Sequence, residues 1–328
     1  MNAPFESATE FSDHATPPAE LQESSALQSE PLAANSRIIW TLIAGLLVVT
    51  AAACWAAGLS SSRETIGRYA ACLLILMATS YCYRKLRPDA RVALCVEGLA
   101  QLSLVLWLGC VLSYAVATVD MPYRDSMLHA ADAWIGLDWR AYLHFLDRHR
   151  ALSVVSAVSY RSAVPQIVAL FVALAATSQF LRMQQYILAT ALALAMTLAV
   201  FAFVPAGGIY SFFGIQPEEY SNLAPIVTTR QLLVLDALRS GQLVTIEALE
   251  GLITFPSFHT VWAILFMWGF YPIRRLWLVA IFLNLLMIAS TPVVGSHYFV
   301  DLVGGTIVAL AAVSAAVRLF PAEGPRQR

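Results

Sequence analysis

Residues 255–301, FPSFHTVWAILFMWGFYPIRRLWLVAIFLNLLMIASTPVVGSHYFVD, hold the most informative pattern in this chain. It begins with the polar motif FPSFHT and ends with a second polar motif, STPVVGSHYFVD. Between the motifs the only charged residues are the arginine pair at 274–275. This pattern predicts two membrane helices joined by a tight turn, which return the chain to the surface from which it started. We therefore expect His259 and His297 to face each other at one membrane surface.

The composition of the 328-residue chain is that of an integral membrane protein, because 59% of its residues are hydrophobic and 12% are charged. Soluble domains carry about 25% charged residues. The formal net charge of −1 offers no basic surface, so no nucleic-acid partner is expected. All five cysteines lie in apolar runs without metal-ligand spacing or a disulfide framework, which predicts buried packing residues.

The apolar runs predict an all-α integral membrane protein with about eight transmembrane helices. A spanning helix needs about 20 apolar residues. The eight expected spans are Ile38–Leu59, Tyr69–Tyr83, Val92–Val119, Leu152–Ser178, Gln185–Val204, Phe258–Tyr271, Leu276–Ser290 and Tyr298–Leu319.

The segments outside these spans differ in composition. Residues 1–36 carry six acidic residues and no lysine or arginine, which predicts a disordered acidic tail. Two accessory transmembrane helices are expected within 37–91. Aromatic and polar residues at helical spacing predict a helix lying in the membrane interface at 122–150. A long extracytoplasmic loop is expected at 205–254, and a loop of this length usually serves function; a cytoplasmic tail follows at 321–328.

The arginines and lysines predict the orientation of the chain. Placing the N-terminus inside puts the basic residues between 84 and 91 in the first cytoplasmic loop, as the positive-inside rule requires. Both termini are then cytoplasmic and both polar motifs are extracytoplasmic. A short chain with an acidic tail fits a bacterial inner membrane.

The two motifs place groups that suit phosphoryl chemistry. Ser257 is expected to cap a helix, so that His259 lies in its first turn, where free amides and the helix dipole attract an anion such as phosphate. His297 and Asp301 are four residues apart and are expected on one face of the next helix. There, Asp301 can orient the imidazole and stabilise the imidazolium. This predicts that His297 attacks phosphorus while His259 protonates the leaving oxygen.

The pattern Pro-Ser-x-His followed by Ser-x6-His-x3-Asp resembles the last two signature motifs of the type 2 phosphatidic acid phosphatase superfamily. FPSFH and HYxxD look most like its inositolphosphotransferase branch, which includes the inositol phosphorylceramide synthases. The resemblance implies a six-helix catalytic membrane domain at about 92–320 and a phosphohistidine at His297, with His259 as the acid. It also implies that no metal and no cofactor are required.

Two departures from the superfamily's motifs concern the binding of phosphate. The arginine that usually follows the serine of the last motif is replaced by Thr291, and the first signature, Lys-x6-Arg-Pro, is missing. Another arginine must then meet the phosphate charge; Arg161 is the first choice, and Arg230 and Arg239 in the long loop are further candidates. The expected substrate-binding residues are Ser257, Arg161, Ser290, Thr291 and Arg230.

The sequence thus predicts a metal-independent lipid phosphatase or phosphotransferase that acts on a phospholipid or lipid phosphate in the bilayer. The acceptor is either water or a lipid hydroxyl. A zinc site built from the two histidines and the aspartate is an alternative, since these are legitimate zinc ligands. The rival from another class is a non-catalytic transporter or binding protein, although a transporter is expected to show broken helices or repeated halves near the midplane.

Overall fold

The computed structural model describes residues 19–216, 219–220, 222–223, 230–247 and 251–322 of the chain. The described part is helical apart from one pair of two-residue strands. In chain order the elements are α1 (Ala19–Ala56), β1 (Ser60–Ser61), α2 (Arg63–Lys85), α3 (Ala90–Ala117), α4 (Asp125–Trp134), α5 (Trp139–Arg148), α6 (Arg150–Arg161), α7 (Ala163–Ala176), α8 (Phe180–Phe203), α9 (Ile209–Phe213), α10 (Arg230–Arg239), β2 (Thr245–Ile246), α11 (Phe258–Phe270), α12 (Arg274–Val294) and α13 (Phe299–Leu319).

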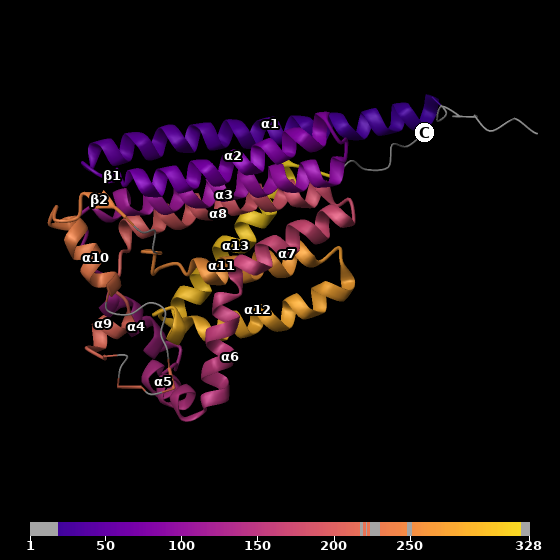
Figure 1. Ribbon diagram of the computed structural model, residues 1–328. Coiled ribbons are helices and arrows are strands. Elements are labelled where there is room, and N and C mark those ends of the chain that lie inside the picture. The colour runs from indigo at the N-terminus through magenta and orange to yellow at the C-terminus, as the bar shows by residue number, and fades with distance from the viewer. Residues whose placement is uncertain (1–18, 217–218, 221, 224–229, 248–250, 323–328) are drawn as a thin grey trace, which may run out of the picture.

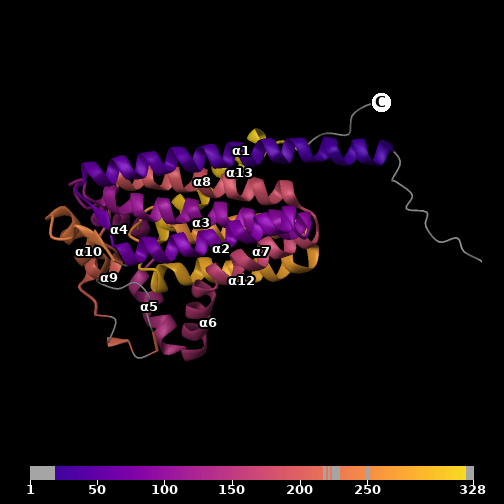
Figure 2. The ribbon, with the colours of Figure 1, turned by 45° about the horizontal axis from the view of Figure 1, so that its top comes forward.

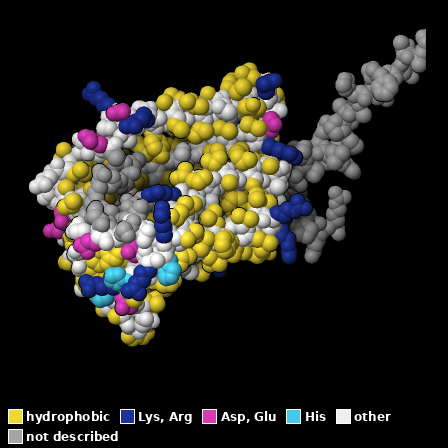
Figure 3. Space-filling model, turned by 60° about the horizontal axis from the view of Figure 1, so that its bottom comes forward, with side chains coloured by type: hydrophobic (Ala, Val, Ile, Leu, Met, Phe, Trp, Pro, Cys, Tyr) yellow, Lys and Arg dark blue, Asp and Glu magenta, His cyan; other side chains and the backbone are white. Residues whose placement is uncertain are grey.

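Six helices of the described part are long and apolar enough to cross a membrane: Glu30–Ala56 within α1, then α2, α3, α8, α12 and α13. The pair α6 and α7 passes the same criteria as one bent span, and α11 is a shorter apolar helix. The prediction of an all-α membrane protein is therefore confirmed, and each expected span coincides with an apolar helix or helix pair. Figure 3 shows apolar side chains over the middle of the molecule and most charged side chains toward its two ends.

The fourth expected span, Leu152–Ser178, is broken. It consists of α6 and α7, which meet at Ser162 and are bent by 53°. Pro165 in the first turn of α7 explains the break, because proline has no N–H to bond the carbonyl of Arg161 and its ring crowds that carbonyl. The uninterrupted helix predicted from the apolar run was wrong on this point.

The predicted disordered tail is also corrected, because α1 begins at Ala19. The helix therefore runs through the second half of the 1–36 segment and on into the first membrane span. This half of the tail is rich in alanine, leucine, glutamate and glutamine, which are good helix formers. Residues 1–18 lie outside the described residues.

The membrane helices form a bundle in which α1, α2, α3 and α8 run side by side (Figure 1 and Figure 2). The short elements α4, α5, α9, α10, β1 and β2 gather toward one end of this bundle (Figure 1). β1 and β2 pair in parallel, which ties the turn between α1 and α2 to the segment before α11. The segment predicted as one interfacial helix at 122–150 folds instead as α4 and α5, with Gly136 at a φ of 76° in the turn between them.

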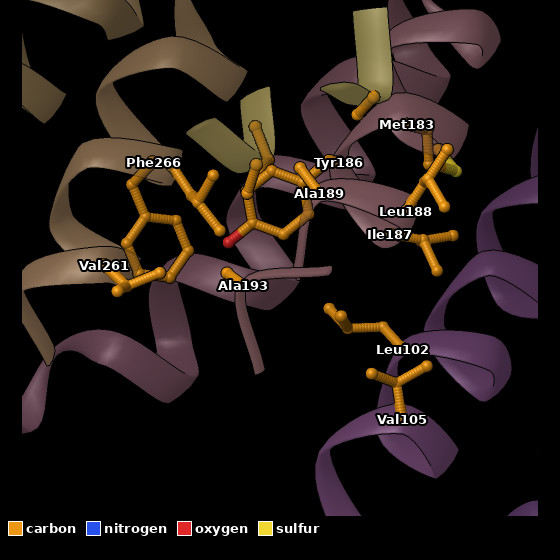
Figure 4. Packing of buried hydrophobic residues seen from close by; sticks show 14 of the residues in the cluster. Leu102, Val105, Met183, Tyr186, Ile187, Leu188, Ala189, Ala193, Val261 and Phe266 are labelled. Atoms are coloured by element: carbon orange, nitrogen blue, oxygen red, sulfur yellow. The ribbon is translucent and has the colours of Figure 1, made fainter. Parts of the chain in front are cut away.

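The core of the bundle is centred on α8, which packs against α3, α11 and α13. Tyr186 of α8 is fully buried and stacks on Phe266 of α11 at a ring-centroid distance of 6.1 Å. Figure 4 shows these two rings close to Val261, while Leu102 on α3 lies opposite Ile187. This packing fixes the height of α11 in the bundle and with it the position of the FPSFHT motif.

Candidate active site

The first motif forms the N-terminus of α11. Ser257 is the N-cap residue, and its hydroxyl oxygen accepts a hydrogen bond from the Thr260 amide at 3.4 Å. His259 is the second residue of the helix, as the sequence predicted. Amides in a first helical turn have no intrahelical carbonyl to bond, and the helix dipole adds partial positive charge there. This end of α11 is therefore suited to bind an oxyanion beside an imidazole.

The second motif places a buried imidazole on a buried carboxylate. His297 Nδ1 lies 3.0 Å from Asp301 Oδ2, and the Tyr298 amide donates to the same oxygen at 2.9 Å. The exposed fractions are 4% for His297 and 0% for Asp301. With Nδ1–H donating to the carboxylate, Nε2 keeps its lone pair and can act as a nucleophile.

His297 and Asp301, four residues apart, are brought together in a different way from the shared helix face that the sequence predicted. His297 does not lie on the helix, because α13 begins at Phe299. Asp301 is in the first turn of α13 and reaches back to the amide of Tyr298 and the ring of His297. The turn before α13 is tight. Ser296 has a left-handed φ of 59°, a conformation whose free energy is roughly 1–2 kcal/mol less favourable for a residue other than glycine.

The N-termini of α11 and α13 are joined directly. The Ser257 amide donates to the backbone carbonyl of Asp301 at 3.1 Å. A Cβ atom on Gly305, one turn further along α13, would lie 2.5 Å from the Ser257 carbonyl oxygen, so only glycine permits this approach. The two motifs, which are far apart in the sequence, are therefore fixed to each other through their backbones.

Tyr160, the penultimate residue of α6, contacts His259 and lies against Gly295, two residues before His297. Its ring stacks on the His259 imidazole with a centroid distance of 3.9 Å and an interplanar angle of 17°. Its hydroxyl lies against Gly295, since a Cβ atom built there would be 2.7 Å from that oxygen and 2.8 Å from His297 Cδ2. The His259 ring also contacts the Trp262 ring edge to face, at a centroid distance of 5.6 Å. Tyr160 was not predicted as a site residue from the sequence.

Two aspartates of α4 hold the segment that carries His297. Asp132 accepts hydrogen bonds from the amides of Phe299 and Val300 at 2.9 and 2.8 Å, and so caps α13 from outside that helix. Burial raises the pKa of Asp132, while these two amides act in the opposite direction. Asp125 accepts from the Tyr298 hydroxyl at 2.8 Å.

Aromatic donors hold the C-terminal end of α12, whose last carbonyls have no intrahelical donors. Trp139 Nε1 donates to the Pro292 carbonyl at 2.9 Å, and the Tyr210 hydroxyl donates to the Val293 carbonyl at 3.0 Å. Trp139 follows Asp138, which caps α5 by accepting from the Ala141 amide at 3.1 Å. The four residues GLDW, 136–139, therefore start a helix and place a buried indole against the end of α12 that precedes the His297 turn.

The predicted substrate-binding residues are dispersed. Ser290 and Thr291 are buried, and both hydroxyls donate to the Met287 carbonyl, at 2.7 and 2.8 Å, so these protons are not available to a phosphate. Arg161 ends α6 directly after Tyr160 and is exposed. Arg230 begins α10, and its side chain lies outside the described residues.

Two further predictions from the sequence concern Arg239 as a phosphate-binding residue and a zinc site as the alternative to the phosphohistidine. The Arg239 guanidinium lies over the Tyr123 ring at 4.0 Å and 3.8 Å from the Asp120 carboxylate. Within the described part of the chain, no group of three or more histidine, cysteine, aspartate or glutamate side chains is arranged to hold a metal ion. Among the described residues, His259 therefore does not join the His297–Asp301 pair as a third metal ligand.

Comparison with protein families gave one match: residues 126–315 fit the family model described as the PAP2 superfamily. The match begins at α4 and extends through most of α13, so it contains both histidine motifs and Tyr160. No curated protein and no solved structure matched the chain.

Proposed function

The chain belongs to the PAP2 superfamily, which implies a membrane phosphatase-type activity, and we propose on this premise that His297, Asp301 and His259 form its catalytic centre. The observation that carries the proposal is the buried hydrogen bond from His297 Nδ1 to Asp301 Oδ2, with a second histidine at the adjoining end of α11. A lipid phosphate or phospholipid in the bilayer is the proposed substrate.

The first proposed step forms a phosphohistidine. Nε2 of His297 attacks phosphorus and the bond between phosphorus and the lipid oxygen breaks. His259 gives a proton to that oxygen, and the negative charge of Asp301 stabilises the imidazolium at His297. The first-turn amides of α11 stabilise the charge on the phosphoryl oxygens.

The second step reverses the roles. His259, now neutral, takes a proton from the acceptor hydroxyl, whose oxygen attacks phosphorus and releases His297. With water as acceptor, a lipid phosphate yields inorganic phosphate and a phospholipid yields its phosphorylated headgroup. With a lipid hydroxyl as acceptor, the product is a new phospholipid. FPSFH and HYxxD resemble the inositolphosphotransferase branch, and we propose transfer to a lipid hydroxyl as the finer assignment. Ser257 and Arg161 are the proposed additional contacts to the substrate.

The test uses purified protein in detergent–lipid micelles with EDTA present. Phosphate release and headgroup transfer are measured on phosphatidic acid, phosphatidylglycerol phosphate, undecaprenyl pyrophosphate, and phosphatidylinositol with ceramide. We expect EDTA-resistant activity on at least one substrate, and the product separates a phosphatase from a transferase.

The decisive variant is His297→Ala, which removes the nucleophile and is expected to abolish turnover and the trapping of labelled phosphohistidine. His144→Ala, an exposed histidine of α5, is the matched control and is expected to behave as wild type. If His297→Ala is as active as wild type, or if wild type is inert on the whole panel, the catalytic assignment is wrong.

A further inference from the structure

His259 and His297 differ in the partners that orient them. His297 has the buried carboxylate of Asp301 at 3.0 Å. His259 has no carboxylate partner among the described residues, and its ring contacts the rings of Tyr160 and Trp262. A general acid must carry a proton, and its ring must be held in a fixed orientation. Since no described carboxylate lies beside His259, another group must orient its imidazole.

The face of Tyr160 can fulfil it. A cation within about 6 Å of the face of an aromatic ring is attracted by the ring quadrupole. The Tyr160 and His259 rings are closer than this, at 3.9 Å, and nearly parallel, at 17°. Tyr160 is itself 4% exposed and lies at the end of α6, which packs along α12, so its ring has a fixed position against which the imidazole can be held.

We infer that Tyr160 is a positioning residue for the general acid: its ring face holds the His259 imidazole in a fixed orientation and attracts it when it carries its proton. Its hydroxyl lies against Gly295, which helps to fix the position of the ring, but the ring face is the part that acts on His259. This inference rests on the proposed function, because it assigns Tyr160 to the step in which His259 protonates the leaving oxygen.

The test depends on the leaving group. Two phosphate esters of the substrate class identified by the micelle experiment are compared. They carry the same phosphoryl group and differ only in the leaving group, which is an alkyl alcohol in one and a nitrophenol in the other. An alkoxide must be protonated to leave, whereas a nitrophenolate leaves without a proton. A residue that acts through the general acid is therefore needed for the first ester and not for the second.

We expect Tyr160→Leu to lower kcat/KM for the alkyl ester by about tenfold to a hundredfold, a part of the 10²–10⁴-fold that general acid catalysis contributes. We expect the same variant to change kcat/KM for the nitrophenyl ester by less than about threefold. Tyr160→Phe keeps the ring face and is expected to retain most of the activity on both esters.

Tyr186→Leu is the matched control, since it removes another fully buried tyrosine, stacked on Phe266 in the bundle core. It is expected to lower the amount of folded protein and to leave the ratio between the two esters unchanged. Equal losses on both esters in Tyr160→Leu would reduce Tyr160 to a packing residue and overturn the inference. A loss in Tyr160→Phe as large as that in Tyr160→Leu would also overturn it, because the hydroxyl and not the ring would then be responsible.

His297→Ala in the same assays separates the two claims. If it abolishes turnover of both esters while Tyr160→Leu leaves their ratio unchanged, the proposed function holds and the role of Tyr160 is wrong. If His297→Ala remains active, the proposed function fails whatever Tyr160→Leu does.

Discussion

The Asp301 carboxylate is the residue on which the candidate site depends most. It is completely buried, and its Oδ2 atom is shared by the His297 ring and the Tyr298 amide. A buried charge is costly unless it is paired or hydrogen-bonded. Here the first turn of α13 supplies an amide and the positive end of a helix dipole, which offset part of the cost of burying an anion where a phosphohistidine mechanism needs one.

Asp301→Asn tests the charge without removing the shape. The asparagine oxygen can still accept from the Tyr298 amide, so we expect little loss of thermal stability. The negative charge that stabilises the His297 imidazolium is lost, and kcat should fall by about 10²–10⁴-fold. Turnover and a thermal melt of the same preparation check both expectations, and a variant with turnover within threefold of wild type would contradict the role given to Asp301.

Gly295→Ala tests the close contact between α6 and the His297 turn. The added methyl group would lie 2.7 Å from the Tyr160 hydroxyl and 2.8 Å from both His297 Cδ2 and the Thr291 carbonyl oxygen. Because one of these atoms is backbone, the turn must shift, and we expect a loss of activity of at least tenfold. Gly45→Ala, where a Cβ atom meets nothing within 4 Å, is the control expected to retain wild-type turnover.

The sequence predicted the residues whose chemistry is local and missed those that act across the fold. The spacing of His297 and Asp301 correctly indicated a hydrogen bond, and Ser257 correctly indicated a helix cap. Tyr160 and Asp132 reach the site only through tertiary packing, and a single tyrosine in an apolar run carries no signal for it. The GLDW motif did carry a signal, because an aspartate before an indole at a helix start is a cap followed by a core residue.

At the scale of the elements, α4 and α5 act as a brace for the His297 turn. Asp132 caps α13 and Trp139 bonds the end of α12, so the two helices on either side of the turn are held by one neighbouring segment. Amphipathic spacing in 122–150 indicated helical structure, but the pattern of one segment does not identify the helix termini that it will cap. The α6–α7 break was predictable in principle, since Pro165 lies inside the apolar run.

Asp132→Ala should show what this brace contributes. It leaves the Phe299 and Val300 amides without their acceptor, and a buried unsatisfied donor costs about 1–3 kcal/mol. We expect a lower melting temperature together with reduced kcat, because α13 carries Asp301. Asp132→Asn can still accept a hydrogen bond from one amide, so its melting temperature and kcat should lie between those of Asp132→Ala and wild type. The role of the brace is disproved if Asp132→Ala melts and turns over like wild type.

At the scale of the whole molecule, the bundle has two unlike ends. The N-termini of α11 and α13, which carry the candidate catalytic residues, lie toward the same end as α4, α5, α9 and α10. The turns between α2 and α3, α7 and α8, and α11 and α12 lie toward the other end (Figure 1). The arginine distribution favours cytoplasmic termini and an extracytoplasmic site. The orientation is therefore a prediction that can be tested with one probe at each end.

Cysteine labelling provides that test. In a variant whose five cysteines are replaced by alanine, Ser240→Cys after α10 and Gln179→Cys before α8 each introduce one exposed thiol. A membrane-impermeant maleimide added to intact cells should label position 240 and not 179. Detergent-opened cells, in which both positions must react, are the control, and the reverse labelling pattern would invert the orientation.

The position of the proposed catalytic groups at one end of the bundle has a consequence for lipid traffic. The hydrogen-bonded N-termini of α11 and α13 hold His259 and His297 near one end of the bundle, so under the proposed mechanism only lipids whose phosphates lie in the adjoining leaflet are processed. A lipid made in the opposite leaflet must first cross the bilayer, and its turnover is then limited by that crossing. In a sealed vesicle with uniformly inserted protein, consumption should stop when the accessible leaflet is exhausted and resume when transbilayer movement is induced.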